Sequence, residues 1–73
     1  MDREPILRDL VRAELAIVKG EQRIAKQRAL IDSLSRRGLD TTDAKSLLHV
    51  FEQNLAALVA GRVRLREELE QTT

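Results

Sequence analysis

The segment "SRRGLDTTDA", residues 35–44, divides the chain into two helical halves. Two arginines precede Gly38, and cations suit the negative C-terminal end of a helix. Gly38 can adopt the left-handed conformation that ends a helix, with Leu39 folding back onto the last turn. Asp40 or Thr41 then offers a side-chain oxygen to cap a second helix. The segment therefore predicts a helix end, a short turn and a new helix.

The pattern on either side of this segment predicts an all-α fold. We expect helices over residues 4–37 and 42–70, joined by a turn at 38–41, within one domain that covers 1–73. Pro5 lies in the first turn of the first helix, where its missing N–H breaks no hydrogen bond. No run alternates apolar and polar residues with a period of two, so no strand is predicted.

Apolar residues recur at heptad spacing along both helices and form one stripe on each. Folding the chain near Leu39 places the two stripes opposite each other at a single register, which indicates an antiparallel two-helix hairpin. Small residues tend to face large ones, and Gly20 and Gly61 are interpreted as close-packing positions. We call the facing positions the seam: Leu10, Ala13, Ile17, Gly20, Ile24, Gln27, Ile31, Leu34, Ala44, Leu48, Phe51, Leu55, Leu58, Arg62, Leu65 and Leu69.

Two seam positions are polar. Arg62 falls opposite Ile17, with Glu14 and Glu21 one turn to either side. We expect its stem to pack in the seam while its guanidinium reaches a carboxylate or solvent. The alternative is a buried arginine that binds an anion or a partner. Gln27 is interpreted in the same way, and the sequence leaves open whether the two pair within one chain or between chains.

Charged residues beside the seam also fit this register. Glu14 falls opposite Arg66, and Arg28 falls opposite Glu52. Exposed ion pairs of this kind contribute about 0.2–1 kcal/mol each. They therefore favour the register more than they favour stability.

A hairpin of 73 residues has one seam and no enclosed core. Burying a valine or leucine contributes roughly 1.5–3 kcal/mol, so leaving many of them exposed is unfavourable. Since the chain has no cysteine, oligomerisation is the common remaining route to stability. We expect a twofold homodimer that forms a four-helix bundle; the alternatives are a monomer with untidy flanks or a fragment of a longer coiled coil. The candidate dimer face comprises Leu7, Val11, Val18, Ala25, Ala56, Val59 and Val63. The opposite flank carries Leu30, Leu47, Val50 and Ala57, and the sequence does not decide which flank is used.

The composition argues against catalysis, cofactors and metals. His49 is the only histidine, and the heptad count places it on the outer face of the second helix. The serines have no other histidine as a base, and no phosphate loop, calcium loop or zinc motif occurs. We therefore predict a non-enzymatic protein without cofactor or metal ion.

Neither a membrane span nor a secretion signal is predicted. The longest uncharged apolar run, "LAALVAG" at residues 55–61, is too short to cross a bilayer. The N-terminus "MDREPILRDL" carries acidic residues and lacks the apolar core of a signal peptide. Together with the absence of cysteine, this predicts a cytoplasmic protein.

A row of basic residues keeps nucleic acid open as an alternative partner. The chain has 13 basic and 12 acidic residues, so no global field attracts polyanions. Phe51 is the only aromatic residue, which disfavours binding by base stacking. Small hairpin dimers that bind structured RNA nevertheless use one helix face in a similar four-helix architecture. The corresponding row here comprises Arg8, Arg12, Lys19, Arg23 and Lys26.

About fifty residues of the chain carry a pattern of helix, glycine turn and second helix. Its positions are Gly20, Glu21, Ile24, Gln27, Leu34, Gly38, Asp40, Thr41, Ala44, Leu47, Leu48, Phe51, Leu55, Arg62, Leu65, Glu68 and Leu69. With these positions, the chain resembles small uncharacterised proteins of rhizobia and other alphaproteobacteria. The resemblance implies a helical hairpin in a bacterial cytoplasm and brings no activity with it. The function expected is a homodimeric helical module for protein–protein interaction, such as a small adaptor or regulator. The alternative is a small RNA- or DNA-binding regulator.

Overall fold

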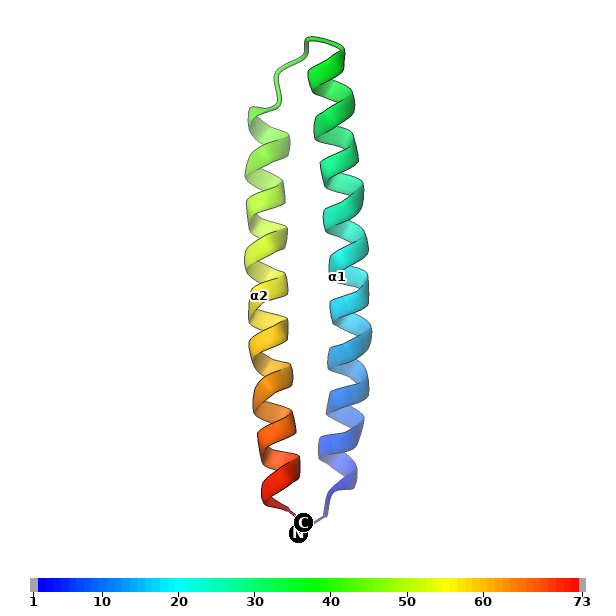
Figure 1. The fold of residues 1–73 in the computed structure, drawn as a ribbon, viewed down its shortest axis with the longest axis vertical. Coiled ribbons are helices and arrows are strands. Elements are labelled where there is room, and N and C mark those ends of the chain that lie inside the picture. The colour runs from blue at the N-terminus through cyan, green and yellow to red at the C-terminus, as the bar shows by residue number, and fades with distance from the viewer. Residues whose placement is uncertain (1, 73) are drawn as a thin grey trace.

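The computed structural model describes residues 2–72 and consists of two long helices joined by a short turn (Figure 1). Helix α1 spans Glu4–Arg36 and helix α2 spans Thr42–Gln71. The helices run antiparallel, so the two ends of the chain lie together, opposite the turn, in a rod of 57 × 14 × 12 Å. The predicted all-α hairpin is confirmed. We call the end that holds the turn the turn end, and the other the open end.

Helix α1 ends in a Schellman motif centred on Gly38. The backbone φ of Gly38 is +71°, a conformation that glycine adopts without steric cost. Its N–H donates to the carbonyl of Ser35 at 3.0 Å, and the N–H of Leu39 donates to the carbonyl of Leu34 at 2.9 Å. These are the two hydrogen bonds that define the motif. The Leu39 side chain remains 47% exposed, so the backbone closes the helix and the side chain covers little of it.

Asp40 lies two residues before the first residue of helix α2 and accepts hydrogen bonds at the start of this helix. Its carboxylate accepts hydrogen bonds from the Thr42 N–H at 3.0 Å and from the Thr42 hydroxyl at 2.7 Å. These two hydrogen bonds hold the pKa of Asp40 below its ordinary value, and the bond from the hydroxyl has the larger effect. Thr41 makes no side-chain capping bond. Of the two candidates for the cap, Asp40 therefore supplies the oxygen.

The core is a single row of side chains between the helices. Every seam position is buried or half-buried. The deepest are Ile17, Ile24 and Gln27, which are 5%, 6% and 8% exposed. Within residues 2–72, Ile17 and Ile24 are the only apolar residues in the buried class. Two helices can enclose no more than one row, so the interior of one chain is thin.

The two seam-side glycines differ in their surroundings. A Cβ atom on Gly20 would lie 3.3 Å from Cδ1 of Leu55, so Gly20 allows close approach of the helices. A Cβ atom on Gly61 would meet nothing within 4 Å. The interpretation of Gly61 as a close-packing position is therefore wrong. Gly61 lies seven residues after Asn54, which places it beside the seam rather than in it.

Candidate functional site

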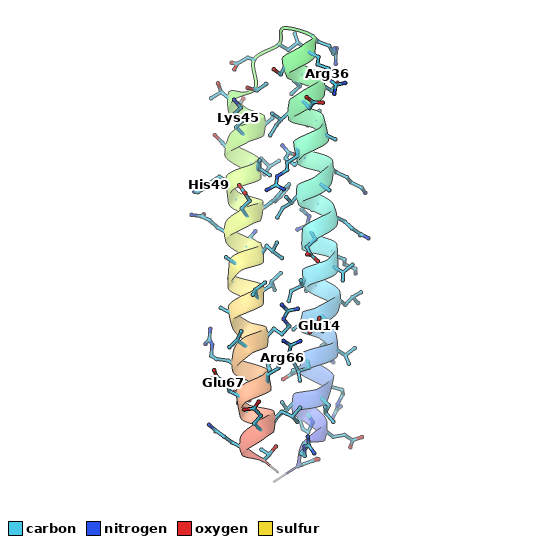
Figure 2. All side chains as sticks on the ribbon, viewed as in Figure 1. Glu14, Arg36, Lys45, His49, Arg66 and Glu67 are labelled. Atoms are coloured by element: carbon cyan, nitrogen blue, oxygen red, sulfur yellow. The ribbon has the colours of Figure 1, made fainter. Side chains whose placement is uncertain are left out.

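Two interhelical ion pairs set the register of the hairpin. Glu14 Oε1 lies 3.1 Å from a terminal nitrogen of Arg66, near the open end, and Figure 2 shows the two side chains between the helices. Arg28 lies 3.3 Å from Glu52, nearer the turn. Both pairs are the ones expected from the register, and both are confirmed. On α1 the acid is near the open end and the base near the turn, whereas on α2 the order is reversed.

Arg62 joins the first of these pairs. A terminal nitrogen of its guanidinium donates to Oε2 of Glu14 at 3.2 Å, and its side chain is 24% exposed. The stem packs in the seam and the head reaches a carboxylate, as expected. Its Nε is buried, and no hydrogen-bond partner for this atom lies in the described part of the chain. A buried donor without a partner costs about 1–3 kcal/mol, so Arg62 is a costly choice for this position.

Gln27 and Phe51 have contacts that the register alone did not predict. The register places Gln27 opposite Phe51, but its amide nitrogen donates to the carbonyl of Ala44 at 2.9 Å, two helical turns before Phe51 on α2. The face of the Phe51 ring is covered by Arg23, whose guanidinium carbon lies 5.4 Å from the ring centre. A cation over an aromatic face is attracted by the ring quadrupole. One sign of the contact between Arg23 and Phe51 was present in the sequence. Arg23 lies one helical turn before Gln27, the seam residue that the register places opposite Phe51.

Both polar seam residues therefore find partners within their own chain. Arg62 pairs with Glu14, and Gln27 pairs with Ala44. The guanidinium nitrogen of Arg62 and the amide nitrogen of Gln27 that make these contacts therefore need no partner from a second chain. Pairing of Arg62 with Gln27 across a twofold axis, which the sequence left open, is not needed.

One side of the hairpin combines an apolar groove with charged rims. We call this side the valine flank, and it contains the candidate dimer face Leu7, Val11, Val18, Ala25, Ala56, Val59 and Val63. Its groove has a volume of about 610 Å³ and is lined by Glu21, Ile24, Ala25, Arg28, Glu52, Leu55, Ala56 and Val59. Leu7, Val18 and Val63 are 44–47% exposed, and Val11 is 69% exposed. Val59 alone among the seven residues is half-buried.

The other side, which we call the basic flank, carries the predicted row of cations. The row Arg8, Arg12, Lys19, Arg23 and Lys26 is exposed throughout. Arg12 lies 3.9 Å from Asp9, an exposed contact that dilutes the row only slightly. A smaller groove of about 180 Å³ lies beside Lys19, Arg23 and Asn54. Nearer the turn this flank exposes Leu30, Leu47, Val50 and Ala57.

The single histidine and the acidic side chains of residues 2–72 form no metal-binding group. His49 is exposed and points away from α1 (Figure 2). No group of three histidine or acidic side chains in the described chain could hold a metal ion. Neither α1 nor α2 combines the length and apolar content that crossing a membrane requires. The notable surfaces of the described chain are thus its two flanks.

Comparisons with protein-family models, with curated proteins and with solved structures found no match to this chain.

Proposed function

We propose that this chain is a homodimeric helical interaction module that acts as a small adaptor or regulator in the cytoplasm. Two hairpins would join through the valine flank into a four-helix bundle, and the remaining faces would bind another protein. The observation that carries the proposal is the exposure of Leu7, Val11, Val18 and Val63 on one side of a hairpin whose own core is thin. Exposed apolar side chains gathered on one side of a protein are typical of an interaction site.

The accessible surface of the hairpin supports the same proposal. The chain exposes 5568 Å². A compact protein of 8.3 kDa exposes about 4,600 Å² by the usual scaling with mass. The excess, roughly 1,000 Å², is similar to the area that each partner contributes to a stable interface, about 800 Å². A second copy on one flank would therefore bury an area similar to this excess.

Light scattering coupled to size exclusion tests the proposal directly. We expect a solution mass of twice 8.3 kDa at micromolar concentration, falling towards 8.3 kDa on dilution. A mass of a single chain at millimolar concentration would contradict the homodimer. Affinity capture with the purified dimer then addresses the adaptor role, with a well-folded, dimerisation-deficient variant as the matched control.

A nucleic-acid-binding regulator is the second candidate, and it rests on the basic flank. The five cations lie on one stripe of α1 and are all exposed, so they are accessible to phosphates. Titration with an RNA hairpin at several salt concentrations tests this function. Binding through this row predicts an affinity that falls steeply with salt, with a slope that decreases when Lys19 and Lys26 are replaced by glutamine. An affinity too weak to measure at low salt would exclude it.

A further inference from the structure

We propose that the two hairpins pack with both turns at the same end, so that α1 of each copy lies against α2 of the other. The twofold axis then runs along the bundle. This inference rests on the proposed homodimer and specifies its geometry. It follows from the charges and the apolar rows of the valine flank.

The charges on this flank repeat at heptad spacing. Helix α1 presents Glu14, Glu21 and Arg28 at intervals of seven. Helix α2 presents Glu52, Val59 and Arg66, also at intervals of seven. The observed ion pairs place Glu14 level with Arg66 and Arg28 level with Glu52. A twofold axis along the helices brings α1 of one copy opposite α2 of the other at the same level. Each acid then meets a base of the second copy, and the complementarity seen within one chain is repeated between chains.

The apolar rows match in the same arrangement. Val11, Val18 and Ala25 form one row on α1, and Ala56 and Val63 form the facing row on α2, each at intervals of seven. With both turns at one end, the valines of each copy meet valines of the other near the open end. Ala25 meets Ala56 of the second copy at the level of the groove, where small side chains allow close approach.

The opposite orientation produces a like-charge contact in either register. A twofold axis perpendicular to the helices sets α1 against α1 of the second copy, running antiparallel. If the rows meet with Val18 on Val18, Glu14 falls beside Glu21 of the second copy. If the axis shifts so that Glu14 meets Arg28, the two copies of Glu21 face each other. Like charges in juxtaposition at an interface are costly, and the parallel arrangement avoids them.

The basic flank is unsuited to meeting its own copy. Its α1 edge carries five cations in one stripe, which would meet itself about a perpendicular twofold axis. About an axis along the bundle, the stripe would face the α2 edge of the second copy, where Val50, Asn54 and Ala57 offer no matching acids. The valine flank carries both signs at matched levels. The second copy therefore belongs on the valine flank.

Spin labels at single cysteines measure the orientation. The chain has no cysteine, so Ser35→Cys at the turn end and Gln71→Cys at the open end each give one unique label per copy, at an exposed position. For parallel hairpins we expect pulsed electron resonance to give a distance below about 30 Å in both variants, because neighbouring helix axes lie about 8–10 Å apart. Antiparallel hairpins in the two registers above would give roughly 40–50 Å for the Ser35 label and roughly 30–40 Å for the Gln71 label, so the Ser35 label separates the two orientations most clearly.

The solution mass of the same labelled samples separates the possible failures. A single-chain mass overturns the homodimer and the orientation together. A dimer mass with long distances overturns the orientation and leaves the homodimer in place. Adding Val63→Lys to each labelled chain should abolish the short distances, while Val50→Lys should preserve them. Short distances that survive Val63→Lys would overturn the assignment to the valine flank.

Discussion

The two flanks of the hairpin expose similar apolar side chains but differ in how their charges are arranged. Val63 on the valine flank and Val50 on the basic flank belong to the same helix, and both are 47% exposed. Around Val63 both signs of charge are present and are paired across the seam, as in Glu14 with Arg66. On the basic flank, one helix edge carries five cations and a single acid, Asp9. Apolar exposure by itself therefore does not identify a self-associating surface; the pattern of charge around it decides.

The largest expected effect separates the two flanks. Val63→Lys should raise the Kd of the homodimer by about 100-fold or more, because twofold symmetry introduces two desolvated cations into one interface. Val50→Lys is the matched control in residue type, helix and exposure, and should change the Kd by less than about threefold. Sedimentation equilibrium of both variants measures the effect. Equal weakening by the two substitutions would remove the distinction between the flanks.

A smaller effect concerns the arginine in the seam. Arg62→Leu should raise the free energy of unfolding by about 1–2 kcal/mol, because it removes a buried unpartnered Nε and loses an ion pair of lesser value. The Kd should remain within about threefold, since Arg66 still pairs with Glu14. Urea unfolding followed by circular dichroism measures stability, and Arg64→Leu, at an exposed position of the same helix, is the control. A loss of stability specific to Arg62→Leu would show that its ion pair outweighs the desolvation cost.

A third prediction compares the seam with the space beside it. Gly61→Ala should stabilise the protein by about 0.5–1 kcal/mol, because alanine favours the helix and the new methyl group meets no neighbour. The free energy of unfolding of Gly20→Ala should be lower than that of Gly61→Ala by at least about 1 kcal/mol, because the methyl group at position 20 would press on Leu55. Thermal unfolding of the two variants gives the comparison. A gain at Gly20 equal to that at Gly61 would mean that Leu55 moves aside freely.

The smallest effect involves the turn, which is common to both flanks. The lowered pKa of Asp40 means that the unfolded chain binds its proton more readily than the folded chain. Its contribution to stability is therefore complete above the ordinary pKa of 3.8 and is lost as the pH falls through the folded pKa. Asp40→Asn keeps an acceptor oxygen but does not titrate, so its melting temperature should fall less between pH 5 and about pH 2 than that of the parent protein.

A control in the same turn isolates this effect. Asp43→Asn removes a nearby carboxylate but leaves the Asp40 cap intact. Its acid sensitivity should follow that of the parent protein more closely than the Asp40 variant does. If the Asp40→Asn variant has the full acid sensitivity of the parent, carboxylates elsewhere account for it.

The sequence predicted the hairpin because its signals are local and repeated. Gly38 ends α1, and Asp40 precedes α2, so the position of the turn depends on a few adjacent residues. The heptad rows predicted the register, and the ion pairs Glu14–Arg66 and Arg28–Glu52 confirm it. Helix bounds differed from those expected by one residue at the C-terminal ends, where the last turn of a helix is defined least sharply.

The contacts of long side chains could not be predicted in the same way. The Gln27 amide reaches the carbonyl of Ala44, Arg23 covers Phe51, and a Cβ on Gly61 would face open space. Each depends on the rotation of both helices about their axes and on side-chain torsions, which heptad spacing leaves undetermined. The sequence by itself thus determined where the chain turns and which rows face each other, because these follow from backbone conformation and helical periodicity. Only the tertiary structure decided which polar groups meet, because that requires the positions of both helices at once.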